Sequence, residues 1–249
     1  MQLDLEGRVA IVTGASRGLG EAAATALVAE GVRVLAAARS TAALEKLQSA
    51  DPERIAIATV DMRDADQVAA LADAAVERFG RLDVVVNNAG IAPAGRFVDQ
   101  PQEEWDEVFA VNVRAPAVLA RAAGRHFIAQ RSGKVINVAS TSGINGKPTL
   151  VSYSASKGAV LQFTKALGAE WARFGIQVTA IAPGAFETDA QAAVLESPQI
   201  LERRLRKIPA GRMGTVAEFG PLVCYLASPL SDFMTGTVVV IDGGEVTKL

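Results

Sequence analysis

Short runs of valine and isoleucine alternate with longer segments of helical spacing, and this alternation restricts the fold more than any other feature of the chain. The runs are apolar at consecutive positions, which is typical of strands whose two faces are both buried. The intervening segments, clearest at residues 20–30, 64–79 and 152–174, repeat apolar residues every three to four positions, as amphipathic helices do. Strand–helix alternation requires crossovers, so we predict an α/β fold with a doubly wound, seven-stranded parallel sheet and helices on both faces. The predicted strands are residues 9–12, 32–35, 55–60, 82–86, 135–138, 176–181 and 238–241.

The chain contains no linker rich in proline, glycine or serine, so we predict one domain over residues 1–249. One segment breaks the alternation: residues 186–214 form a long amphipathic insertion between the sixth predicted strand and a helix that starts near Thr215. Insertions at the carboxyl ends of such strands cover the ligand crevice, so we expect a substrate lid here. Its basic side chains either bind an anionic substrate, such as a sugar acid or a phosphopantetheine thioester, or form a solvated helix face. They are Arg203, Arg204, Arg206 and Lys207.

The composition excludes several classes of function. One histidine and one cysteine among 249 residues are too few for a disulfide framework or a zinc site, and we expect no metal. We expect His126 to be a surface or structural residue. A net charge of −2 lacks the basic field that nucleic-acid binding needs. No apolar run approaches the ~18 residues of a membrane span and the N-terminal segment lacks a signal-peptide pattern, so we expect a cytoplasmic protein.

A glycine-rich segment, TGASRGLG, follows the first predicted strand and leads into a helix at Glu21. Glycine permits positive φ angles and lets a phosphate approach the backbone closely. The helix N-terminus adds free N–H groups and a positive dipole end. Gly14, Gly18 and Gly20 would also suit an ordinary tight turn, but their place between a strand and a helix at the start of an alternating fold favours dinucleotide binding.

Three motifs in this order resemble those of the short-chain dehydrogenase/reductase family. They are the Gly-x3-Gly-x-Gly loop, NNAG at residues 87–90, and Tyr153-x3-Lys157. The resemblance extends from Gly7 to Gly244 and implies a Rossmann fold, a nicotinamide dinucleotide, and a homotetramer in which residues 105–130 and 152–174 form one dimer interface. Within the family, the stretch from GKVINVASTSG through IPAGRMGTVAEF looks most like the gluconate 5-dehydrogenase and 3-oxoacyl-carrier-protein reductase branches.

The second predicted strand ends in VLAAARS, where Ala38 takes the position at which NAD enzymes carry an acid for the ribose 2′-hydroxyl. Arg39 follows it, and Arg17 lies in the glycine loop. Two guanidinium groups suit a 2′-phosphate, which guanidinium binds bidentately. We therefore expect NADP(H) rather than NAD(H); the alternative is that both arginines are solvated surface charges.

The resemblance also assigns residues to the cofactor. Asp61 and Met62 would lie at the adenine ring, although Asp61 could instead cap the following helix, a role that suits Asp64 better. The turn at Asn88 would line the cofactor, and the segment that begins at Pro183 would meet the nicotinamide carboxamide. The expected cofactor-binding residues are Gly14, Ser16, Arg17, Gly18, Leu19, Gly20, Arg39, Asp61, Met62, Asn88, Ala89, Gly90, Tyr153, Lys157, Pro183, Gly184, Phe186 and Thr188.

Tyr153 and Lys157 are four residues apart and so share one helix face. A tyrosine exchanges protons poorly near neutral pH because its pKa is near ~10. We expect the lysine ammonium, together with an oxidised nicotinamide ring, to lower that pKa. By resemblance, Ser140 would hydrogen-bond the reacting carbonyl oxygen, a role that the neighbouring Thr141 and Ser142 fit less well by their spacing. Asn112 would help to hold a water in the proton relay, or it is a buried polar residue bonded within a helix.

These residues predict an oxidoreductase that transfers hydride between NADP(H) and a carbonyl group or secondary alcohol, with Tyr153 as general acid and base. The substrate would be a sugar acid or another small ketone. A 3-oxoacyl-carrier-protein reductase is the alternative within the family. A non-catalytic dinucleotide sensor is the alternative from another class, but it predicts the loss of Tyr153, Lys157 or Ser140, and all three are present.

Overall fold

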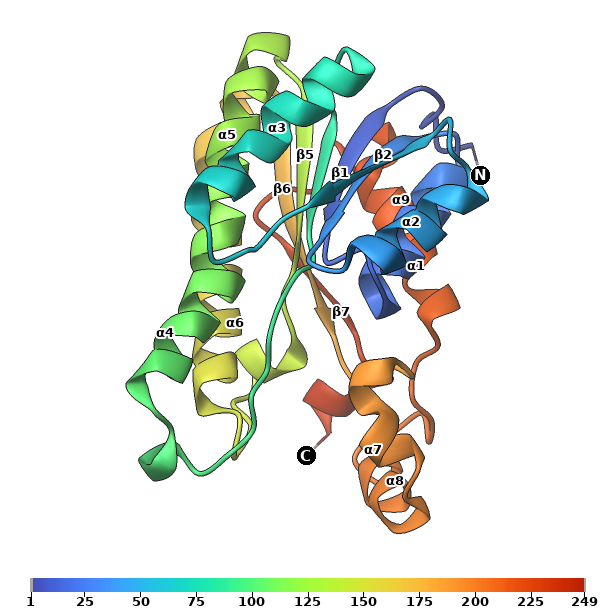
Figure 1. Cartoon of the computed structure of the whole chain (residues 1–249). Helices are drawn as coiled ribbons and strands as arrows, with labels where there is room; N and C mark the ends of the chain where they lie inside the picture. The colour runs from blue at the N-terminus through green and yellow to red at the C-terminus, as the bar shows by residue number, and fades with distance from the viewer. Residues whose placement is uncertain (1, 249) are drawn as a thin grey trace.

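Each predicted valine- and isoleucine-rich run forms a strand, and the strands pair in parallel. The computed structural model describes residues 2–248 and arranges the strands in the order β3-β2-β1-β4-β5-β6-β7 (Figure 1). The prediction of a doubly wound parallel sheet is therefore confirmed, with strand ends that differ by a few residues from those predicted. The strands are β1 Val9–Thr13, β2 Arg33–Ala38, β3 Ile55–Thr59, β4 Val84–Asn87, β5 Gly133–Val138, β6 Ile176–Pro183 and β7 Val238–Ile241.

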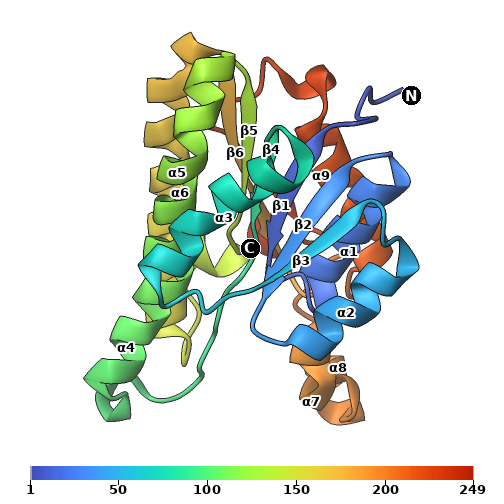
Figure 2. The same cartoon turned by 45° about the horizontal axis from the view of Figure 1, so that its top comes forward.

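Helices cover both faces of the sheet, as the crossovers require (Figures 1 and 2). One face carries α1 (Gly18–Ala29), α2 (Thr41–Ala50) and α9 (Gly220–Ala227). The other carries α3 (Ala65–Phe79), α5 (Ala115–Gln130) and α6 (Val151–Trp171). The remaining α-helices are α4 (Gln102–Phe109), α7 (Ala192–Leu195) and α8 (Pro198–Leu205). Among residues 2–248, no helix is both long enough and apolar enough to span a membrane.

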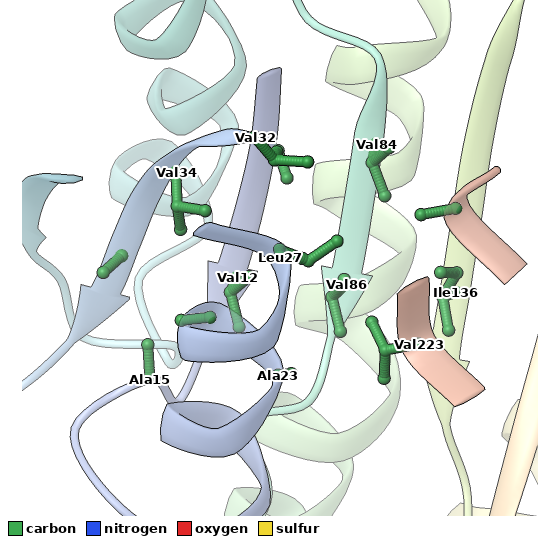
Figure 3. Packing of buried hydrophobic residues seen from close by; sticks show 14 of the residues in the cluster. Val12, Ala15, Ala23, Leu27, Val32, Val34, Val84, Val86, Ile136 and Val223 are labelled. Atoms are coloured by element: carbon green, nitrogen blue, oxygen red, sulfur yellow. The ribbon is translucent and has the colours of Figure 1, made fainter. Parts of the chain in front are cut away.

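The apolar core lies on both sides of the sheet because successive strand residues point to opposite faces. Val12 of β1 packs with Leu27 of α1 and Val223 of α9 on one side (Figure 3). Val9 and Ile11 of the same strand belong to the cluster under α3 and α5 on the other side. This two-sided burial is the physical reason why the strands are apolar at consecutive positions.

The order of the strands reverses at β1, which has β2 on one side and β4 on the other. Val12 of β1 is in register with Val86 of β4, so the loops that follow these two strands start side by side. Ligands of doubly wound sheets bind at such a switch point, outside the carboxyl ends of the strands. The fold therefore places the glycine loop after β1 and the NNAG turn after β4 at one crevice.

The ends of α3 illustrate how local sequence sets the helices. The Asp64 carboxylate accepts hydrogen bonds from the backbone N–H groups of Asp66 and Gln67, which confirms Asp64 as the N-cap. Gly80 ends the helix in the left-handed conformation. Residues 186–214, in contrast, form no single amphipathic helix. They contain a 3-10 turn at Asp189–Gln191 and the short helices α7 and α8, the latter starting at Pro198.

Candidate active site

The loop after β1 and the turn after β4 are held together by hydrogen bonds. The Thr13 hydroxyl oxygen accepts from the backbone N–H groups of Asn88 and Ala89 at 3.0 and 3.1 Å. The Asn88 side-chain amide donates in return to the carbonyl oxygens of Thr13 and Gly14. The NNAG turn thus holds the start of the glycine loop in place through the Asn88 side chain. The sequence pattern does not indicate this structural role of Asn88.

The glycine loop has the features that a pyrophosphate requires. A Cβ atom at Gly20 would lie 2.2 Å from the carbonyl oxygen of Gly14, so only glycine allows α1 to approach the loop this closely. Gly18 starts α1 with φ +59°, a backbone conformation that favours glycine. No side chain caps the first turn of α1, whose N–H groups are therefore available to an anion. These observations fit a bound dinucleotide phosphate.

A cleft of about 750 Å³ extends from this loop along the carboxyl ends of the strands. It is lined by all of the residues that the sequence assigns to the cofactor and also by Ser140, so the fold brings together segments that are far apart in the chain. Asn112 is the one expected site residue that is not among the lining residues. The cleft wall also includes residues to which the sequence assigned no role, among them Lys147, Leu150 and Gln191.

Arg17 and Arg39 are exposed at the edge of the cleft beside the buried Ala38. Neither guanidinium has a hydrogen-bond or ion-pair partner within residues 2–248, so both can take a phosphate. The carboxylate of Asp61, which also lines the cleft, is held by Arg63 in a 2.9 Å hydrogen bond. This contact lowers the pKa of Asp61 to about 2 and partly neutralises the charge that would repel a 2′-phosphate.

Lys157 is buried, with an exposed fraction of 4%. Its ammonium donates a 2.7 Å hydrogen bond to the carbonyl oxygen of Val138 and lies 5.8 Å from the centre of the Tyr153 ring. Burial lowers the pKa of Lys157 to about 8, because the charged form loses its hydration. The lysine therefore carries less charge near neutral pH than an exposed one.

Tyr153 differs from the expectation in the direction of its pKa shift. Burial raises the pKa of the phenol above its ordinary value, and the Ser140 hydroxyl opposes this shift only in part. The prediction that Lys157 lowers the pKa of Tyr153 is therefore wrong when only the residues of the chain act on the phenol. The physical reason is that removing the phenol from water disfavours the phenolate, while the Lys157 ammonium donates its hydrogen bond to the Val138 carbonyl oxygen and lies 5.8 Å from the centre of the tyrosine ring.

Ser140 follows β5 and caps the 3-10 turn at Thr141–Gly143. Its hydroxyl oxygen accepts a 3.1 Å hydrogen bond from the backbone N–H of Ser142, which orients the side chain and leaves the hydroxyl proton for another acceptor. Ser142 itself is buried and its backbone serves as this donor. Both serines line the cleft, so the assignment of Ser140 to the substrate oxygen rests on its oriented hydroxyl group and on its place in the family motif.

Asn112 lies in a π-helical turn, Ala110–Arg114, between α4 and α5. Its side-chain oxygen accepts from the N–H of Ile91, and its amide donates to the carbonyl of Ile91 and to the Ser156 hydroxyl, all at 2.9–3.0 Å. With the side chain 1% exposed and fully engaged, Asn112 is a positioning residue that ties the loop after β4 to α6. The sequence left two interpretations of Asn112, a residue that holds a water and a buried polar residue. Its side chain fits the second, although its hydrogen bonds join different elements rather than one helix. π-Helical turns are frequent at functional sites.

The single histidine and the single cysteine of the chain lie outside the cleft. His126 on α5 contacts Asp73 on α3 at 2.8 Å, which confirms that it lies away from the cleft. Cys224 is buried on α9, and burial raises the pKa of its thiol to about 12. Within residues 2–248, no group of three or more histidine, cysteine, aspartate or glutamate side chains is arranged to hold a metal ion.

Comparison with known proteins finds relatives that match nearly the whole chain. A family model described as "Enoyl-(Acyl carrier protein) reductase" matches residues 14–245. The chain is 37% identical to a 2-dehydro-3-deoxy-D-gluconate 5-dehydrogenase of Escherichia coli (strain K12), over 98% of this chain and 97% of the relative. It is 36% identical to the 3-oxoacyl-[acyl-carrier-protein] reductase FabG of Thermotoga maritima, over 97% and 99%. Its fold matches that of a gluconate 5-dehydrogenase from Burkholderia cenocepacia J2315, solved with NADP and tartrate, with a TM-score of 0.93 at 33% identity over 100% and 98% of the two chains.

Proposed function

Because the chain belongs to the short-chain dehydrogenase/reductase family, we propose that it transfers hydride between NADP(H) and a small sugar acid or its keto form, acting on a secondary alcohol group. The chain is an oxidoreductase of the CH–OH class. One observation carries the proposal: Ser140, Tyr153 and Lys157 line the same cleft as a glycine loop whose helix N-terminus has no side-chain cap. A sugar acid is supported by the activities for which the gluconate dehydrogenase relatives are named.

Bound NADP(H) supplies or accepts the hydride, and the movement of the proton is left to the chain's own residues. The pyrophosphate would lie at Gly18 and the first turn of α1, and the 2′-phosphate between Arg17 and Arg39. Lys157 would bind the nicotinamide ribose hydroxyls. These assignments rest on where the side chains lie in the cleft and on the family motifs.

Tyr153 would protonate the substrate oxygen during reduction and accept its proton during oxidation. Ser140 would donate its free hydroxyl proton to the same oxygen and so fix the carbonyl group. Since burial raises the pKa of Tyr153, the phenol is the form present near neutral pH, and it is the form that reduction needs. The positive charge of an oxidised nicotinamide ring is the remaining influence that would lower this pKa.

The two directions of reaction should therefore depend on pH with opposite signs. Oxidation needs the phenolate, whose fraction increases with pH below the pKa, so kcat/KM for alcohol oxidation should rise across the neutral range. Reduction needs the phenol, so its kcat/KM should be level near neutrality and fall at high pH. Profiles of kcat/KM in both directions between about pH 6 and about pH 10 measure this. An oxidation rate that declines as the pH rises would contradict the role given to Tyr153.

The proposed function is tested by measuring binding and turnover separately. Fluorescence titration with NADPH and NADH establishes cofactor binding. A panel of sugar acids, acetoacetyl thioesters and simple diketones, assayed in both directions with both cofactors, then establishes the substrate class. We expect NADP(H)-dependent turnover with a sugar acid. Turnover of the thioesters alone would instead favour an acyl-carrier-protein reductase, and tight cofactor binding without any turnover would favour a dinucleotide sensor.

We also propose that residues 186–214 act as a lid, since Phe186, Thr188, Gln191 and Arg204 from this segment line the cleft. A homotetramer is the proposed assembly, with residues 105–130 and 152–174 in one dimer interface. Large apolar side chains are exposed just before each of these two stretches, Phe97 and Val98 before α4 and Val151 at the start of α6, and Ile128 is exposed within the first stretch. Light scattering should give four times the mass of one chain, and the mass of a single chain would contradict this assembly.

A further inference from the structure

Two cationic side chains lie at the end of the cleft that is remote from the glycine loop. Lys147 comes from the loop before α6 and Arg204 from α8. Both also line an adjoining cavity of about 580 Å³. No residue of the glycine loop or of the NNAG turn borders this second cavity, so it lies at the substrate end rather than the cofactor end.

The two cations meet at one carboxylate, that of Glu245 in the C-terminal segment. The Arg204 guanidinium donates two hydrogen bonds to it, at 2.6 and 2.8 Å. The Lys147 ammonium lies 3.3 Å from a Glu245 oxygen and 3.3 Å from the Thr141 hydroxyl. The exposed fractions of the side chains are 28% for Lys147, 19% for Arg204 and 11% for Glu245, so the cluster is largely but not fully withdrawn from water.

The cluster has more positive than negative charge. The bidentate contact with Arg204 satisfies Glu245, which leaves Lys147 with two long contacts for three N–H donors. Burial and the neighbouring charges of Arg204 and Lys207 lower the pKa of Lys147, while Glu245 opposes this shift. An additional anion at this position would relieve the repulsion between the cations.

We propose that Lys147, assisted by Arg204, is the specificity-determining residue that binds the carboxylate of the substrate. This inference rests on the proposed dehydrogenase function, because it assigns a substrate class to the same cleft. Lys147 contacts Thr141, the residue that follows Ser140, so the charged subsite lies close to the reacting oxygen. The substrate is therefore a small acid whose carboxylate is only a few carbon atoms from the reacting carbon, rather than a long acyl thioester.

None of Arg203, Arg206 and Lys207 lines the cleft, although Arg206 and Lys207 border the adjoining cavity. Arg206, the residue after the end of α8, forms an ion pair with Glu202 of that helix. Arg203 is exposed and lines neither cavity. The four basic residues within positions 203–207 therefore differ in their surroundings. Of the four, only Arg204 lines both cavities, as Lys147 does.

The test compares gluconate with its uncharged polyol, sorbitol, by calorimetric titration of the complex of the enzyme with NADPH, which cannot oxidise either compound. The variant Lys147→Met keeps the length of the side chain and removes its charge, and Arg203→Met is the matched control. We expect Lys147→Met to weaken gluconate binding about tenfold or more, as the loss of a charge-assisted hydrogen bond does, and to leave sorbitol and NADPH binding unchanged. Lys147→Arg should keep the preference for gluconate, and Arg203→Met should behave as the unmodified enzyme.

Three results would overturn the inference: no gluconate binding by the unmodified complex, equal gluconate affinity in Lys147→Met, or equal weakening of gluconate and sorbitol. The last would mean that Lys147 shapes the loop instead of binding the carboxylate. Turnover assays on the same pair report separately on the proposed function. Gluconate that binds through Lys147 and is neither oxidised nor competitive with a turned-over sugar acid would refute the proposed substrate class and leave the carboxylate subsite standing. Oxidation of gluconate at the same rate and affinity in Lys147→Met would refute the carboxylate subsite and leave the proposed substrate class standing.

Discussion

Replacing Tyr153 by phenylalanine should lower kcat by about 10²–10⁴-fold, the contribution that a positioned general acid or base makes. The substitution removes one oxygen and keeps the ring that packs beside Lys157. The half-buried phenol lies in the cleft next to Ser140, and Ser140 cannot replace it because a hydroxyl group of serine is a far weaker acid. Steady-state turnover of the best substrate from the panel measures the loss, and titration with NADPH should give an almost unchanged Kd.

The chain provides a matched control, because it contains only two tyrosines. Tyr225 on α9 directs its hydroxyl towards the carbonyl oxygen of Leu230, and it does not line the cleft. Tyr225→Phe should therefore retain nearly full activity. If Tyr153→Phe retained a comparable activity, the acid–base role of Tyr153 would be wrong even though the fold and cofactor binding were intact.

Replacing Arg39 by aspartate should reverse the preference between the two cofactors. In the unmodified protein, the guanidinium of Arg39 has no partner within the described residues, and Arg39 lines the same cleft as Arg17. One charge-assisted hydrogen bond contributes about 1.5–3 kcal/mol, so its loss alone should lower kcat/KM with NADP(H) by about 10- to 100-fold. The new carboxylate would repel a 2′-phosphate and could accept a hydrogen bond from a ribose 2′-hydroxyl, which should raise kcat/KM with NAD(H).

Measurement of kcat/KM with each cofactor for the unmodified protein and for Arg39→Asp decides this prediction. Arg203→Asp is the control, since it makes the same charge change on an exposed residue outside both cavities. If Arg39→Asp left the cofactor preference as it was, Arg39 would be an ordinary surface charge. Equal or better use of NAD(H) by the unmodified protein would refute the assignment of NADP(H) itself.

The sequence allowed the strands, their parallel arrangement and the glycine loop to be predicted because each leaves a local signal. Strands buried on both faces need apolar residues at consecutive positions, as β1 has from Val9 to Val12. The contact of α1 with the loop needs a residue without Cβ at Gly20. A helix start needs an acceptor such as Asp64 two or three residues before the free N–H groups. These constraints act over a few residues, so the residues themselves display them.

Other features follow from contacts between residues far apart in the chain. Asn112 is tied to Ile91 and Ser156, and no spacing near Asn112 indicates either partner. Tyr153 and Lys157 share a helix face as predicted, yet the pKa of each depends on how completely the packed protein excludes water from it.

The sequence by itself determined the sheet and the glycine loop and predicted the acid–base pair, whereas the tertiary structure decided how these groups are charged and what else surrounds them. Lys147, Arg204 and Glu245 come from three separate segments and meet only when the lid and the C-terminal segment pack beside the cleft. The physical reason is that periodicity and backbone requirements are local properties of a chain, but burial and the sum of nearby charges exist only after distant segments have packed together.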